Sequence, residues 1–179
     1  MKKNLFISML LAVVIILSSC SKKSSTPTTP TSSNWIQGRY TATGSITLTS
    51  GGVNYSMPMA NVQVVTTDTY SVILNALDST LVTNFGTIVL QINSPTSTGL
   101  TTGTYKIPST TNVNLINFMD KTLTEYTASS SVSGTSATIN ITTLTATSVQ
   151  GTFSATLVPL ENHSGTPITI TNGVINCTY

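Results

Sequence analysis

Few side chains of this sequence could take part in acid–base or nucleophilic catalysis. His163 is the single histidine, and it lies in the polar stretch Glu161–Gly165 between two apolar runs. General acid–base catalysis needs groups whose pKa can be tuned toward neutrality, and a Ser-His-Asp arrangement also needs a positioned serine. The G-x-S-x-G nucleophile elbow does not occur in the sequence. We therefore predict a solvated loop histidine and no enzyme, with a hydrolase assembled across loops as the alternative.

Metal ions and cofactors also find few partners in the sequence. A structural zinc site needs several cysteine or histidine ligands, and the chain has one histidine and two cysteines. Calcium prefers clustered carboxylates, whereas the five carboxylates here are scattered along the chain. Asp120 and Glu125 could meet across a turn, but we expect them to be exposed beside Lys121. Because neither a G-x-G-x-x-G element nor a phosphate-binding loop is present, the sequence predicts no metal and no cofactor.

One cysteine lies in a context that predicts a covalent modification. Two lysines near the start precede the apolar run 5–17, which is too short for the roughly 20 residues that span a bilayer. The run ends in Leu17-Ser18-Ser19-Cys20. In this order the elements resemble the lipobox of bacterial lipoproteins, in which the cysteine thiol is joined to a diacylglycerol and becomes the first residue. We therefore expect residues 1–19 to be a signal peptide and Cys20 the lipid attachment site, with an ordinary secretory signal as the alternative.

The residues after Cys20 are expected to form a spacer and then one domain. Ser21–Ser33 contains two prolines and no aliphatic or aromatic residue, so we predict a disordered, extended tether that reaches about 40 Å. The domain would occupy residues 34–179. Without residues 1–19, five cations face five carboxylates, so the pI of about 8.6 describes the precursor. The absence of a basic patch argues against nucleic acid as a partner and leaves the membrane, through the lipid anchor, as the expected one.

The second cysteine, Cys177, has no partner for an intramolecular disulfide once Cys20 is acylated. It lies in the strand-like run Val174–Cys177 near the end of the chain. We predict that Cys177 is a small buried hydrophobic residue, with a reactive thiol as the alternative.

Apolar residues alternate with hydroxyl residues along most of the domain, and threonine and serine make up 60 of the 179 residues. This period of two is typical of half-buried antiparallel strands, in which the branched threonine suits the outward side of the pleat. Glycine- and proline-containing turn signals separate the runs. We predict an all-β fold, a single antiparallel domain of about nine or ten short strands, arranged as a lipocalin-like meander barrel or as a two-sheet sandwich. The runs that show the alternation lie at 46–48, 70–76, 88–92, 139–141 and 153–157.

Two segments depart from this alternation. Residues 75–84 could form one helical turn capped by Asp78 or Asn75. Residues 113–121 have apolar positions that fit neither period, and we interpret them as a strand with a bulge.

Tyr55, Met57 and Met59 share one side of a segment that Pro58 interrupts, which predicts an edge strand or a bulged strand. A barrel of about eight strands can hold one small ligand, so these three side chains could line an apolar pocket. Packing in the core is the alternative.

Three short elements resemble a group of Bacteroidetes-type lipoproteins. They are Gly103-Thr104-Tyr105-Lys106-Ile107, Gly151-Thr152-Phe153-Ser154 and the run 170–176, which contains Asn172-Gly173. The group carries GTY-x-I, GTFS and ITNG-x-F elements on an all-β domain of unknown function; Ile175 stands here where an aromatic residue is usual. The resemblance spans about residues 85–179 and implies fold and location without an activity. It also implies that Asn172-Gly173 can kink a continuous strand, although by itself the pair is a turn signal.

Two short motifs bear on modification and location. Asp78-Ser79-Thr80 resembles a bacterial O-glycosylation acceptor, which makes Ser79 a candidate site. Ser21 lies directly after Cys20, and a serine at this position resembles the signal that sorts lipoproteins to the outer membrane. In the lipoprotein group resembled here, surface export is associated with acidic residues soon after the cysteine. Lys22 and Lys23 follow Cys20 instead, so the resemblance favours the periplasmic face over the cell surface.

These observations leave two functional hypotheses. The first is a non-enzymatic envelope lipoprotein that binds a hydrophobic ligand, a glycan or a protein partner. The second is a structural or adhesive envelope protein without a small-molecule ligand. A cavity lined by Tyr55, Met57 and Met59 would favour the first hypothesis, whereas a solid core with a flat, exposed threonine face would favour the second.

Overall fold

The structure, a computed structural model, describes residues 37–66, 70–78, 86–94, 99–161, 163 and 165–179. These residues contain eleven strands and no helix, so none of their segments is a helix that could cross a membrane. The expected signal segment, Cys20, the tether and Ser79 lie outside the described residues. The strands are β1 (Gly38–Thr41), β2 (Thr43–Ser50), β3 (Val53–Val65), β4 (Ser71–Asp78), β5 (Gly86–Asn93), β6 (Gly103–Ile107), β7 (Leu115–Met119), β8 (Glu125–Ser129), β9 (Ser136–Leu144), β10 (Ser148–Pro159) and β11 (Ile168–Thr178).

Eight of these strands form a closed antiparallel ring in the order β11–β2–β3–β4–β5–β7–β8–β10, because β10 pairs with β11 again. The other three lie outside the ring: β1 pairs with the second half of β3, β9 pairs with β10, and β6 pairs with β9. The predicted all-β antiparallel fold is therefore confirmed as a meander barrel with extra strands. The number of strands exceeds the nine or ten expected from the sequence.

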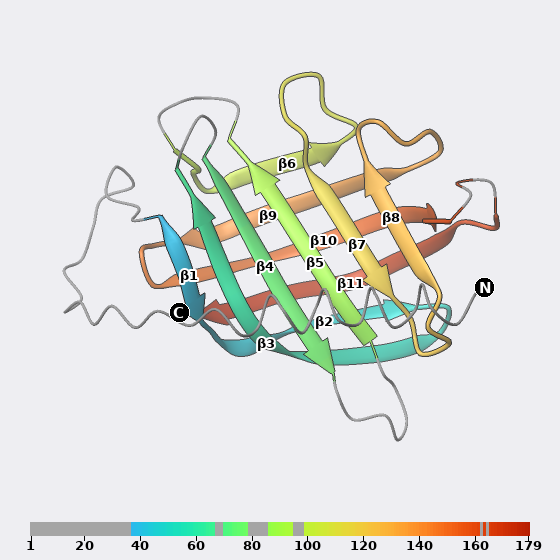
Figure 1. Cartoon of the computed structure of the whole chain (residues 1–179), viewed down its shortest axis with the longest axis horizontal. Helices are drawn as coiled ribbons and strands as arrows, with labels where there is room; N and C mark the ends of the chain where they lie inside the picture. The colour runs from blue at the N-terminus through green and yellow to red at the C-terminus, as the bar shows by residue number, and fades with distance from the viewer. Residues whose placement is uncertain (1–36, 67–69, 79–85, 95–98, 162, 164) are drawn as a thin grey trace, which may run out of the picture.

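The barrel is flattened into two layers that cross each other. In Figure 1, β4, β5, β7 and β8 run diagonally across the front, and β2, β11, β10, β9 and β6 cross behind them. We call the first layer, with β1 and the second half of β3, the front sheet. The second layer, with the first half of β3, is the back sheet.

The two longest strands, β3 and β10, belong to both sheets. β3 pairs with β2 up to Pro58 and with β4 from Met59 onward, and the register shifts between Met59 and Asn61. β10 pairs with β9 and β11 over most of its length, and its residues Val158 and Pro159 pair with β8. The expected bulge near Pro58 is therefore present, but β3 is an inner strand of the ring and not an edge. Pro58 is tolerated because it stands at the last pair with β2, where the strand changes sheets.

Inward side chains fill the space between the sheets with one continuous apolar cluster. Alternation along each strand puts aliphatic groups inside and hydroxyl groups outside, as the sequence pattern predicts. The largest fully buried side chains of this apolar cluster come from strands of both sheets. They are Ile46, Met57, Leu74, Ile88, Leu90, Ile92, Ile116, Phe118, Ile139, Leu157, Ile170 and Ile175.

The strand predicted within residues 113–121 is confirmed as β7, but its bulge and the helical turn predicted at residues 75–84 are wrong where the structure describes them. β7 pairs with β5 and β8 without a register shift, so it has no bulge. Ile116 and Phe118 point inward, whereas Leu115 and Met119 lie half-buried on the outer side, which explains apolar residues at both parities. Residues 75–78 belong to β4 and not to a helical turn, because they pair with residues 86–89 of β5; residues 79–84 lie outside the described residues.

Asn172-Gly173 makes a bulge inside β11 and not a hairpin turn. Asn172 has a φ of 52°, and the pairings of β11 with both β2 and β10 shift register around it. A Cβ on Gly173 would lie 2.5 Å from the Phe153 carbonyl oxygen and 2.6 Å from its ring. Phe153 therefore packs over Gly173, which has no side chain. This contact joins the Gly151-Thr152-Phe153-Ser154 element to the run 170–176.

Replacement of Gly173 by alanine is expected to destabilise the domain. The added methyl group must displace Phe153, and overpacking of this kind costs about 1–3 kcal/mol. Urea unfolding of Gly173→Ala against the parent chain measures this loss. Thr178→Ala, an exposed change in the same strand, is the control and should stay within about 0.5 kcal/mol of the parent. Equal stability of the two variants would contradict the packing of Phe153 on Gly173.

Candidate functional site

The three residues predicted as possible pocket lining are packed inside the core. Tyr55, Met57 and Met59 have exposed fractions of 4, 0 and 7 %. The Tyr55 ring meets Phe118 edge to face at 5.2 Å between centroids, and its hydroxyl accepts the Lys121 backbone N–H at 3.4 Å. Neighbouring atoms thus occupy the space that a ligand beside these residues would need.

A small cavity lies elsewhere, between β4 and β5 on one side and β6, β9 and β10 on the other. Its volume is about 10 Å³, which is room for about one water molecule. None of Tyr55, Met57 and Met59 lines it. The lining residues are Val72, Ile92, Leu100, Thr101, Tyr105, Ile141, Leu144 and Val149.

A network of neutral amides closes the end of the barrel where β5 ends and β7 begins. The backbone N–H of Asn93 donates to Asn114 Oδ1 at 3.0 Å, and Asn114 Nδ2 donates to the Lys106 carbonyl at 3.1 Å. The side chain of Asn93 accepts from Ser71 Oγ and donates to the Val113 carbonyl. These bonds connect β4, β5, β6 and the start of β7. Because none of the bonding groups carries a charge, the network acts as a structural clasp that the sequence analysis did not foresee.

Asp120 and Glu125 are half-buried, whereas Lys121 is exposed, so the prediction that both carboxylates are exposed is wrong. Asp120 Oδ1 accepts from Thr122 N, Thr122 Oγ1 and Thr124 N at 2.8, 2.7 and 3.1 Å, so this carboxylate caps its own turn. Burial raises the pKa of the Glu125 carboxyl, and the charge of Glu161 raises it further. Among the described residues, no three histidine, cysteine or acidic side chains are grouped as metal ligands.

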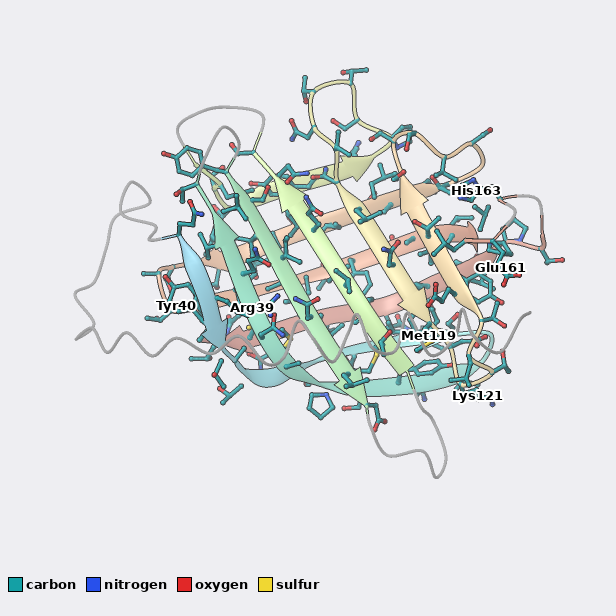
Figure 2. The ribbon with its side chains drawn as sticks, viewed as in Figure 1. Arg39, Tyr40, Met119, Lys121, Glu161 and His163 are labelled. Carbon is teal, nitrogen blue, oxygen red and sulfur yellow. The ribbon has the colours of Figure 1, made fainter. Side chains whose placement is uncertain are left out.

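His163 lies exposed in the connection between β10 and β11, where the sequence analysis expected a solvated loop. Its φ is 52°, and its backbone N–H donates to the Pro159 carbonyl at 3.0 Å. Figure 2 shows its side chain at the same side of the molecule as Glu161 and Lys121. The described residues give this imidazole no serine–carboxylate arrangement, since none of its side-chain atoms has a hydrogen-bond partner among them.

The outer side of the back sheet carries small hydroxyl and amide side chains in rows that cross the strands. One row passes over all six strands, and the pairing registers place each member opposite the next. Its members are Thr104, Asn140, Thr152, Val174, Thr47 and Ser56. Flanking rows contain Lys106, Thr138 and Ser154, then Gln150, Asn176 and Ser45, and finally Thr171, Thr49 and Asn54. We call these fifteen residues the hydroxyl face.

The hydroxyl face is almost uncharged. Lys106 is its one ionic residue, and Val174, 43 % exposed, is its one large apolar residue. Thr49 Oγ1 donates to Asn54 Oδ1 at 2.8 Å, and weaker side-chain contacts join other members. Within the part of the chain that the structure describes, the hydroxyls of Thr138, Thr152 and Ser154 have no protein partner. The alternation in the sequence predicted that threonine side chains point outward. It did not predict which strands pair or in which register, and the rows depend on both.

Cys177 is a buried free thiol in β11, as the sequence predicts. Burial raises the pKa of the thiol to about 11. The ring of the C-terminal Tyr179 stacks at a tilt on Tyr40, 5.5 Å between centroids, and burial also raises the Tyr179 pKa. The thiol is therefore protonated and enclosed at physiological pH.

Thiol reagents are expected to spare Cys177 in the folded protein. In a Cys20→Ala chain at pH 8, maleimide should label Cys177 only after urea has unfolded the domain, because the reactive species is the thiolate. The matched control is Cys177→Ser combined with Thr178→Cys, which moves the thiol by one residue to the exposed side of β11. This control should react at least 100-fold faster without urea. Equal rates for the two chains would contradict the burial of Cys177.

No family model matches this chain, and no curated protein or solved structure shows significant similarity to it. The resemblance of its short elements to Bacteroidetes-type lipoproteins accordingly stays a prediction.

Proposed function

We propose that this chain is a non-enzymatic, lipid-anchored envelope protein with a structural or adhesive role, which contacts its neighbours through the hydroxyl face. The order of the signal elements before Cys20 supports the anchor. The packed core around Tyr55 and Met57 supports contact through an outer surface over carriage of a hydrophobic ligand inside. The single observation that carries the proposal is the row of five hydroxyl and amide side chains, interrupted by Val174, that crosses the whole back sheet.

The chemistry of the hydroxyl face suits a neutral, hydrogen-bonding surface in the envelope. Each threonine or serine hydroxyl can donate one hydrogen bond and accept others, and each amide does both. With Lys106 as its one charge, the face gives little attraction to strongly ionic partners. Threonine side chains on a paired sheet are also stiff at χ1, so contact loses little side-chain entropy. A protein neighbour or an uncharged matrix glycan fits these properties.

The lipid anchor is tested by Cys20→Ala. Two or three acyl chains hold a protein on a membrane almost permanently, at ~0.8 kcal/mol per buried CH₂, so loss of the acceptor thiol should release the protein. We expect the parent chain in the outer-membrane fraction and the variant in the soluble or mislocalised fraction, measured by immunoblot after cell fractionation. A variant that fractionates like the parent would contradict the anchor.

The adhesive role is tested by a single charge in the middle of the hydroxyl face. Thr152→Glu places a carboxylate that a contacting surface must desolvate, which typically costs 2–5 kcal/mol when unpaired. We expect at least tenfold weaker cosedimentation of the Cys20→Ala chain with isolated envelopes, with an unchanged melting temperature. Thr110→Glu, at an exposed loop position away from the face, is the matched control. Parent-like cosedimentation of Thr152→Glu, or a hydrophobic molecule that copurifies in equimolar amount, would contradict the proposal.

A further inference from the structure

We propose that the domain stands on the membrane with a fixed polarity: the end that carries β1 faces the bilayer, and the end that carries the described carboxylates points away from it. The proposal rests on the lipid anchor of the proposed function. It adds an orientation to that anchor, and it follows from where charge and chain entry lie on the barrel.

The described carboxylate side chains gather at one end of the barrel. Asp78 and Glu125 lie at neighbouring levels of the front sheet, where β4 ends and β8 begins. Asp120 belongs to the turn before β8, and Glu161 follows β10, whose end is bonded to β8 by Leu160 N–H to the Glu125 carbonyl at 2.9 Å. We call these four residues and Lys121 the acidic end. One cation and four carboxylates give it a net charge of −3.

The chain enters the domain at the opposite corner of the front sheet. Gly38, the first residue of β1, is level with Val64 on β3, Val72 on β4 and Ile92 on β5. Glu125 lies five strands across from β1 and about five residues further along the strands. With standard strand spacings, Glu125 lies roughly 24 Å from Gly38 across the sheet and about 16 Å from it along the strands. Figure 2 shows the same separation, with Arg39 and Tyr40 on the left and Lys121 and Glu161 on the right.

The charged residues of the sequence before and around the chain entry have the other sign on balance. Arg39 lies on β1, and Lys22 and Lys23 precede it in the sequence. Asp68, in the connection from β3 to β4, falls outside the described residues. Three cations and one carboxylate give +2 for this part of the sequence. Among the described residues the acidic end has a net side-chain charge of −3, whereas the cation Arg39 lies at the chain entry, so the domain is less negative on the side where the spacer joins it.

Anionic headgroups act on such a molecule when it comes near the surface. Their attraction for cations and repulsion of carboxylates extend over a Debye length, about 8 Å at physiological ionic strength and 30 Å at 0.01 M. The attachment point alone leaves many orientations open because the sequence predicts a long spacer. The charge difference between the two ends of the barrel disfavours orientations in which the acidic end lies against the lipid. No ligand is required for this effect, since the shared sign of the carboxylates suffices.

The orientation also sets the direction of the hydroxyl face. The back-sheet strands run between the side of β1 and the side where β10 ends (Figure 1), so they run between the chain entry and the side of Glu161. With the acidic end outward, the hydroxyl face stands upright on the membrane. It then meets molecules beside the domain instead of molecules above it.

Energy transfer from two labelled positions to the membrane tests the orientation. The full lipidated chain is placed in vesicles of equal parts phosphatidylglycerol and phosphatidylcholine that contain a lipid-bound acceptor dye. A donor dye is attached to Gln37→Cys at the chain entry or to Thr166→Cys beside the acidic end, and the buried Cys177 stays unlabelled. We expect at least twofold more transfer from position 37 than from position 166 at 10 mM salt. Equal or reversed transfer would overturn the proposal.

A charge variant separates the electrostatic effect from the attachment point. Glu125→Gln with Glu161→Gln reduces the acidic end from −3 to −1 and should narrow the difference between the two labels, as should 1 M salt. Glu125→Asp with Glu161→Asp keeps the charge and should leave the difference unchanged. A difference that the glutamine variant and salt do not alter would overturn the electrostatic orientation. A chain that fails to float with the vesicles would instead contradict the lipid anchor, and the orientation with it.

Discussion

The whole fold depends on two strands that each serve both sheets. β3 turns from β2 to β4 at Pro58 and Met59, and β10 leaves β11 and β9 to reach β8 with its last two residues. Without these two corners the sheets would be separate layers with four open edges, and an open edge exposes unpaired N–H and C=O groups. The ring closes because both strands are long enough to bend and still pair on each side of the bend.

Closure through only two residue pairs between β8 and β10 leaves little backbone hydrogen bonding at that seam. Two other features support the ring, one at this seam and one at the other end of the front sheet. Leu160 continues the contact by donating to the Glu125 carbonyl, and the clasp of Asn93 and Asn114 holds β5, β6 and the start of β7 together. Buried amides of this kind stabilise most when all their groups are satisfied. The side chains of Asn93 and Asn114 each have a donor and an acceptor partner, whereas the buried Oδ1 of Asn112, whose Nδ2 donates to the Asn93 carbonyl, has none among the described residues.

The sequence predicted the fold class and the inward residues because local alternation carries that information. It did not predict what depends on distant partners. The apolar residues at 115 and 119 suggested a bulge, because a half-buried outer face blurs the period of two. Asn172-Gly173 has turn chemistry, but strands on both sides of β11 hold it in a bulge. Asn114 gave no signal, since its partners lie 8 and 21 residues away. The outward threonines were predictable, whereas their rows required the registers.

The free edge of the back sheet has a consequence for the proposed lipid-anchored protein, which would be confined to a surface. β6 pairs with β9 on one side only, yet its Lys106 carbonyl is occupied by Asn114, the Lys106 side chain is exposed, and Pro108 directly after the strand has no N–H to offer. Anchored molecules share two dimensions and collide in similar poses, which would favour growth of one sheet onto the next. A charged and partly occupied edge resists that growth. With the proposed anchor, molecules of this kind would remain separate folded units even when crowded densely on a membrane.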